Sequence, residues 1–171
     1  KLQSFVFMPV FGLNNGMVPI IAYNYGAGHR DRVIKTIKHS VAYGVGIMFA
    51  GLLAMHIFPA QLMRMFDAEE SLIAIGAPAL ETISLSFVFA GFCIVAGSVF
   101  QALGNGVYSM IVSVARQMCV LLPVAKLLSL SGEVTLIWWA FPIAELASVL
   151  LTSYFLVRIY RKVICHIGEP V

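Results

Sequence analysis

The chain has 171 residues, of which 60% belong to the hydrophobic set AVILMFWYC and 11% are charged, with a formal net charge of +3. Soluble domains carry roughly 45–50% apolar and about 25% charged residues. This composition excludes an ordinary soluble fold, because a fold of this size could not hide so much apolar surface from water, whereas a bilayer could solvate it.

Five apolar stretches are long enough to cross a membrane, which takes about 20 mostly apolar residues. Leu2–Gly28 contains no Asp, Glu, Lys, Arg or His, and Thr82–Ala115 contains no charged residue. The sequence therefore predicts an all-α, polytopic membrane bundle of about five transmembrane helices. In chain order we expect these helices at residues 2–26, 37–63, 72–103, 107–130 and 134–159.

The first helix carries Pro9 and Pro19 on either side of the pair Asn14 and Asn15. Proline lacks a backbone N–H and disturbs a helix, so we expect this helix to be bent or interrupted. Broken helices often line transport sites, which makes both asparagines candidates for a substrate cavity. A packing kink in which the asparagine side chains are satisfied explains the pattern equally well.

Charged or polar segments flank the second helix. After Gly26 and Gly28, the basic run at residues 29–39 is expected to connect the first two helices. A polar connector, Arg64–Glu70, precedes the third helix. The third helix is long for one span, so we expect its first turns, residues 71–81, to lie in the membrane interface.

Large, soft side chains in these spans are candidates for the wall of an adaptable cavity. Met8 in the first helix, with Phe89 and Phe92 in the third, could line a cavity for mixed ligands. Most such residues in membrane helices face lipid or other helices, which is the alternative interpretation. After the third helix, the sequence Gly104-Asn-Gly106 predicts a tight turn.

The fourth and fifth helices, separated by Ser129–Gly132, each contain an ionisable residue within the span. Such residues are costly in hydrocarbon unless they face protein or water, so they are site candidates. Glu145 is a candidate carrier of a proton or another cation, or a structural carboxyl group bonded to a neighbouring helix. Arg116 is expected to pair with Glu145 or a carbonyl, or to extend toward the interface.

Lysine and arginine predict the orientation in the membrane, because they are enriched on the cytoplasmic side. They gather at residues 30–38 and 158–162, two segments that five spans place on the same side. We therefore expect the first connector and the C-terminus to be cytoplasmic and the N-terminus to be outside. A start outside the cell, without Met, suggests that a preceding helix is missing.

Motifs for soluble chemistry are absent from the sequence. No HExxH, GxSxG, P-loop or GxGxxG pattern occurs, which argues against an enzyme, an organic cofactor or ATP-driven pumping by this chain. Cys93, Cys119 and Cys165 show no CxxC spacing and favour neither a metal site nor a disulfide. The basic residues lie mostly at helix ends, which membrane topology explains better than nucleic-acid binding does.

Four motifs in order resemble the multidrug and toxic compound extrusion (MATE) family. Residues 8–27, with Pro9, Gly12, Asn14, Asn15, Gly16, Pro19 and Gly26, look like the eighth of that family's twelve helices. Residues 100–104 (FQALG) resemble the end of the tenth helix. Arg116-Gln117 with Pro123 resembles the eleventh, and residues 138–145 (WWAFPIAE) resemble the twelfth. The resemblance covers nearly the whole chain.

The resemblance implies that residues 1–171 form the C-terminal lobe of a two-lobed transporter without its first helix. The implied function is secondary antiport, in which Na⁺ or H⁺ enters while a cationic or amphiphilic small molecule leaves. The implied partners are the bilayer, the small-molecule substrate and the missing N-terminal lobe, and the implied location is the plasma membrane. Two lobes would rock about a central cavity.

The coupling ion is left open by the resemblance. Some branches of the family use acidic residues on the seventh and tenth helices, and others use an acid in the N-terminal lobe. The seventh helix and the N-terminal lobe are absent, and the tenth helix offers Glu81 alone. Glu81 and Glu145 are therefore the two candidates for ion coupling, the second on the physical grounds given above.

Three other functions are compatible with a membrane bundle. A related flippase for lipid-linked saccharides needs a cationic central cavity, for which Arg116 alone is available. A membrane-embedded enzyme needs paired polar groups at one depth, and His56 has no evident partner. A non-catalytic membrane scaffold would show neither ion-coupled flux nor ligand-dependent stability.

Overall fold

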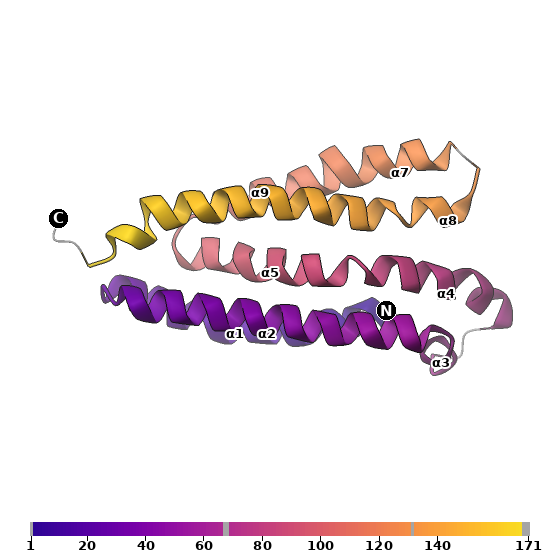
Figure 1. Cartoon of the computed structure of the whole chain (residues 1–171), viewed down its shortest axis with the longest axis horizontal. Helices are drawn as coiled ribbons and strands as arrows, with labels where there is room; N and C mark the ends of the chain where they lie inside the picture. Colours follow the sequence, from indigo (N-terminus) through magenta and orange to yellow (C-terminus); the bar gives the residue numbers. More distant parts are fainter. Residues whose placement is uncertain (1, 67–68, 131, 169–171) are drawn as a thin grey trace.

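The computed structural model describes residues 2–66, 69–130 and 132–168, and these residues form an elongated helical bundle (Figure 1). The first half contains α1 (Leu2–Gly26), α2 (Arg30–Ile57), α3 (Pro59–Arg64), α4 (Glu70–Ser84) and α5 (Phe87–Ala102). The second half contains α6 (Gly106–Val114), the π-helix η1 (Ala115–Leu121), α7 (Leu122–Ser129), α8 (Val134–Ile137), α9 (Ala140–Lys162) and the 3₁₀ turn η2 (Ile164–His166).

By length and composition, the described helices offer four membrane spans, or five if one bent pair of helices is a single span. Four helical stretches are long and apolar enough to cross a membrane: Leu2–Gly26, Arg30–Ile57, Gly106–Ser129 and Thr135–His166. The pair α4 and α5 passes the same test together, with a 52° bend between the two helices. The predicted fold class, an all-α multi-pass bundle of about five spans, is confirmed.

Several predicted helix boundaries are wrong. The basic run expected as a connector is instead the start of α2, which begins at Arg30 after Gly28 takes the left-handed conformation (φ 72°). Arg and Lys are good helix formers, and their long side chains reach water from inside a helix. The second predicted helix is divided at Phe58, where Pro59 starts α3. The third and fifth are divided at residues 85–86 and 138–139.

Two predicted connectors lie partly outside the described residues. The segment Arg64–Glu70 includes Asp67 and Ala68, and Ser129–Gly132 includes Ser131. On either side of the first segment, α3 ends at Arg64 and α4 begins at Glu70. The side chains of these two residues form an exposed ion pair at 3.1 Å.

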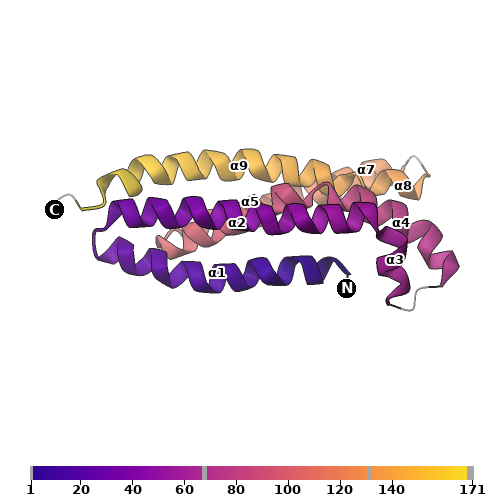
Figure 2. The same ribbon diagram turned by 60° about the horizontal axis from the view of Figure 1, so that its bottom comes forward.

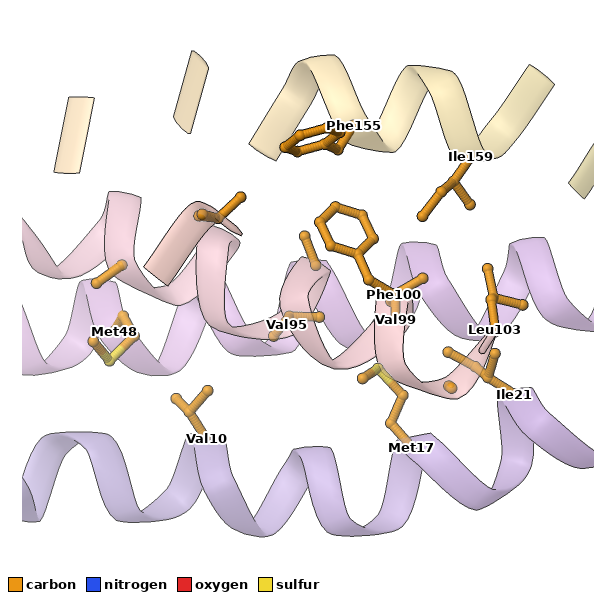
Figure 3. Packing of buried hydrophobic residues seen from close by; sticks show 14 of the residues in the cluster. Val10, Met17, Ile21, Met48, Val95, Val99, Phe100, Leu103, Phe155 and Ile159 are labelled. Atoms are coloured by element: carbon orange, nitrogen blue, oxygen red, sulfur yellow. The ribbon is translucent and has the colours of Figure 1, made fainter. Parts of the chain in front are cut away.

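The core lies where α5 packs against α1, α2 and α9 (Figure 3). Phe100 and Val99 of α5 are fully buried and lie among side chains of the other helices. Tyr108 of α6 stacks on Phe155 of α9 with ring centroids 4.5 Å apart. Further buried members include Val10, Met17 and Ile21 of α1, Met48 of α2 and Ile159 of α9.

Two glycines allow α2 and α5 to approach closely. A Cβ atom added to Gly91 would lie 2.8 Å from Cγ of Met48 and 3.1 Å from the carbonyl oxygen of Gly44. A Cβ added to Gly44 would lie 2.6 Å from Val95. Small residues are typical of membrane helix interfaces, because they let two backbones come together.

The turn between α1 and α2 lies at the same end of the bundle as the C-terminal segment (Figures 1 and 2). Arg30 Nη2 donates a hydrogen bond to Cys165 Sγ at 3.9 Å. A Cβ added to Gly168 would lie 3.0 Å from the carbonyl oxygen of Gly28. The prediction that these two basic segments share one side of the bundle agrees with this arrangement.

Candidate functional site

A groove of about 740 Å³ runs between α1, α5, the α6–η1 segment and α9. Its wall combines aromatic rings, among them Phe7, Phe11 and Phe100, with many polar side chains. The polar groups include Asn14, Asn15, Gln101, Ser109, Ser113 and Thr152. Concave sites with a mainly apolar wall and a few placed polar groups are the usual form of small-molecule sites.

Arg116 and Glu145 form an ion pair in this groove. Arg116 Nη1 donates to Glu145 Oε1 at 2.5 Å. The Glu145 side chain is 7% exposed, whereas the Arg116 side chain is 41% exposed. The carboxylate is therefore covered by protein and by the guanidinium, which itself stays open to the groove. Among the described residues that line the groove these two alone are charged, so their formal charges cancel.

The π-helix η1 carries Arg116 toward α9. Within η1 the hydrogen bonds span five residues instead of four, as from the N–H of Leu122 to the carbonyl of Gln117. Pro123 has no N–H to donate to Cys119, the bond that an α-helix would require. Short π segments inside α-helices occur frequently at functional sites.

A polar stripe on α9 accompanies Glu145. Ser148 and Thr152 follow it at spacings of three and seven residues and are buried, so they lie on the same helix face. Ser148 Oγ donates to the Ala144 carbonyl at 2.9 Å, and Thr152 Oγ1 donates to Cys93 Sγ at 3.7 Å. Sequence reasoning did not single out the two hydroxyl residues, although their spacing from Glu145 was a usable signal.

Asn14 and Asn15 both line the groove from α1. Asn14 is 7% exposed, and its Oδ1 accepts no hydrogen bond from the described residues. The first helix was expected to be bent or interrupted, and the interruption is wrong, because α1 is continuous from Leu2 to Gly26 with both prolines inside it. Membrane helices tolerate internal proline when surrounding groups satisfy the freed backbone.

The remaining candidates lie outside the groove. Met8 is 64% exposed, and Phe89 and Phe92 are half-buried without lining it. Glu81 is half-buried on α4, where its backbone carbonyl accepts the Ser84 hydroxyl. The groove thus brings together Asn14, Asn15, Arg116 and Glu145, and the roles of all eight candidates stay predictions.

Comparison with known proteins gives a consistent set of similarities. The family model described as MatE matches residues 1–127. "Multidrug export protein MepA" from Staphylococcus haemolyticus (strain JCSC1435) is 24% identical over 163 residues, covering 95% of this chain and 35% of that protein. MepA from Staphylococcus aureus (strain N315) is 25% identical over 146 residues, covering 85% and 32%. The chain therefore spans about a third of the length of these curated relatives.

Two solved structures share the fold. The MATE multidrug transporter DinF-BH, solved in complex with a ligand, has a TM-score of 0.83 and 32% identity, covering 95% of this chain and 36% of that chain. An inward-facing multidrug resistance MATE family transporter of the MOP superfamily has a TM-score of 0.81 and 15% identity. That match covers 94% of this chain and 39% of that one.

Proposed function

Since this chain belongs to the MatE family, we propose that it forms the C-terminal lobe of a two-lobed secondary transporter that exports small molecules in exchange for Na⁺ or H⁺. Its span of about a third of the relatives' length is compatible with one incomplete lobe. The groove, open and lined from four helical segments, is the part of this lobe that would face the substrate. The opposite wall of the substrate cavity would come from the other lobe of the transporter.

The ion pair between Arg116 and Glu145 is the observation that best supports ion coupling. A carboxylate held by a single guanidinium inside a groove can exchange that partner for a proton or a sodium ion. Arg116 would then be released toward the groove, where 41% of its side chain is already exposed. Binding of the coupling ion and the charge of the groove would thereby be linked, which is what antiport requires.

The wall of the groove suits amphiphilic compounds. Phe7, Phe11 and Phe100 offer apolar and aromatic surface, and hydroxyl and amide groups lie between them. A cationic ring system gains from contact with aromatic faces. DinF-BH is described as a multidrug transporter, and the relatives named MepA are described as multidrug export proteins. We extend multidrug export to this chain, with cationic or amphiphilic small molecules as its substrates.

The same charges argue against a lipid-linked saccharide flippase. Such a protein must hold a pyrophosphate, which calls for a surplus of positive charge in the cavity. In the groove of this lobe Arg116 is already paired with Glu145. The basic residues at 30–38 and 158–162 lie toward the same end of the bundle and support a cytoplasmic position for that end. The membrane would be the plasma membrane.

The proposed function is tested by dye efflux from cells or proteoliposomes that contain the full-length transporter. We expect ethidium efflux to slow about tenfold or more when an ionophore collapses the driving gradient, because the coupling free energy is lost. A protonophore and a sodium ionophore, applied separately, identify the ion. Efflux that persists without either gradient and depends on ATP would contradict antiport.

A further inference from the structure

A second cleft, of about 620 Å³, lies between α1 and α2. It shares no lining residue with the substrate groove. Its α1 wall is a row of residues spaced by four, Gly12, Gly16, Ile20 and Asn24, which therefore stack along one helix face. A Cβ added to either glycine would meet no atom within 4 Å, so the absence of side chains leaves this part of the cleft open.

The α2 wall of the cleft is basic. Arg32, Lys35 and His39 follow one another along the face that lines it, and all three are exposed. No Asp or Glu is among the described residues that line the cleft. Unlike the substrate groove, the cleft therefore carries positive charge that no lining carboxylate neutralises, and it suits an anionic ligand.

Asn24 supplies a polar group within the same cleft. It is 7% exposed, and its Nδ2 donates to the Ile20 carbonyl at 2.8 Å. Its Oδ1 is buried and accepts no hydrogen bond from the described residues. Buried polar atoms are normally paired, so this oxygen lacks a donor that a bound hydroxyl group would provide.

Polarity changes along the length of the cleft. The basic side chains and Asn24 lie toward the end of the bundle where α1 ends and α2 begins. Gly12 lies twelve residues further into α1, which at 1.5 Å per residue is about 18 Å deeper in the membrane. The apolar part of the lining, Leu13, Met17 and Ile20, comes from the same helix. A ligand that fits this gradient has a charged head at the surface and an apolar chain.

We propose that the cleft between α1 and α2 binds an anionic phospholipid. The phosphodiester lies against Arg32 and Lys35, a headgroup hydroxyl of a lipid such as phosphatidylglycerol donates to Asn24, and an acyl chain lies over Gly12 and Gly16. Basic pockets between transmembrane helices at a membrane surface are suited to anionic headgroups. A helix from another part of the transporter would need acidic side chains to pair with Arg32 and Lys35. The surrounding bilayer already contains anionic headgroups that can do so.

The test is lipid retention by the full-length transporter, measured by native mass spectrometry after exchange into phosphatidylglycerol or phosphatidylcholine. One basic residue near an anionic headgroup changes affinity about fivefold, so we expect Lys35→Gln to weaken phosphatidylglycerol binding about fivefold. Gly16→Leu is expected to displace the lipid by filling the open part of the cleft. Lys38→Gln and Gly46→Leu are matched controls on α2 outside the cleft, and both should retain lipid as the wild type does.

Three results would overturn the lipid site. Equal retention of phosphatidylcholine would show that the charge of the head is not recognised. An equal loss in Lys38→Gln would show diffuse attraction to the helix end instead of a site. Absence of retained lipid in the wild type, with no effect of any variant, would show that another segment of the transporter fills the cleft. None of these measurements depends on whether the protein transports ions.

Discussion

Glu145→Gln in the full-length transporter is expected to slow ion-driven efflux about tenfold or more, with nearly normal amounts of folded protein in the membrane. The amide keeps the shape of the side chain and an oxygen that accepts a hydrogen bond from Arg116. It cannot release a proton or hold a sodium ion by charge, so under the proposed coupling the driving gradient would no longer act on this lobe. Initial rates of ethidium efflux in proteoliposomes with an imposed gradient, normalised to protein, measure the effect.

Glu81→Gln is the matched control, since it removes the other candidate carboxyl group, which lies outside the groove. We expect it to leave the efflux rate unchanged. Exchange of labelled for unlabelled substrate without any gradient separates coupling from structure, and Glu145→Gln should retain it. A normal gradient-driven rate in Glu145→Gln would remove Glu145 from the coupling mechanism, and loss of both activities would assign it a structural role.

Gly91→Leu is expected to lower the midpoint of thermal unfolding by on the order of 5 °C, because overpacking costs about 1–3 kcal/mol. Its first side-chain atom would meet Met48 at 2.8 Å and the backbone of Gly44 at 3.1 Å. The side chain of Met48 can move, but the backbone of α2 cannot move without separating from α5. Size-exclusion chromatography of detergent-solubilised protein after heating gives the midpoint.

Gly46→Leu controls for the intrinsic effect of leucine in a membrane helix. A Cβ at Gly46 meets no atom within 4 Å, so this variant should match or exceed the wild-type midpoint. Equal midpoints for Gly91→Leu and the wild type would mean that α2 and α5 separate at no cost. The close approach of these two helices would then have no part in stability.

The number and order of the spans could be predicted because they depend on local composition. Twenty apolar residues have few alternatives to crossing the bilayer. The positions of helix breaks also depend on packing, and only some of them are marked by a residue such as proline or glycine. Pro59 was a readable signal, since proline favours the first turn of a helix. The break at Leu85 and Ser86 has no proline or glycine, and only the tertiary structure reveals it.

The charged part of the site was easier to predict than the apolar part. Arg116 and Glu145 stand out because each is costly in hydrocarbon alone, and pairing was one of the alternatives considered. A phenylalanine such as Phe89 carries no such cost, because lipid, a neighbouring helix and a cavity solvate its ring almost equally. Phe7 and Phe11, which line the groove, could therefore not be told from Phe89 and Phe92.

The bend between α4 and α5 also determines the depth of Glu81. With 16 residues, α5 rises about 24 Å. Residues 81–86 precede α5, and because of the 52° bend they add only about 6 Å along the axis of α5. Measured along that axis, Glu81 therefore lies about 30 Å from Ala102. The hydrocarbon layer is about 30 Å thick. A bilayer that ended level with Ala102 on one surface would end level with Glu81 on the other, and the carboxyl group would then lie at the border between hydrocarbon and water.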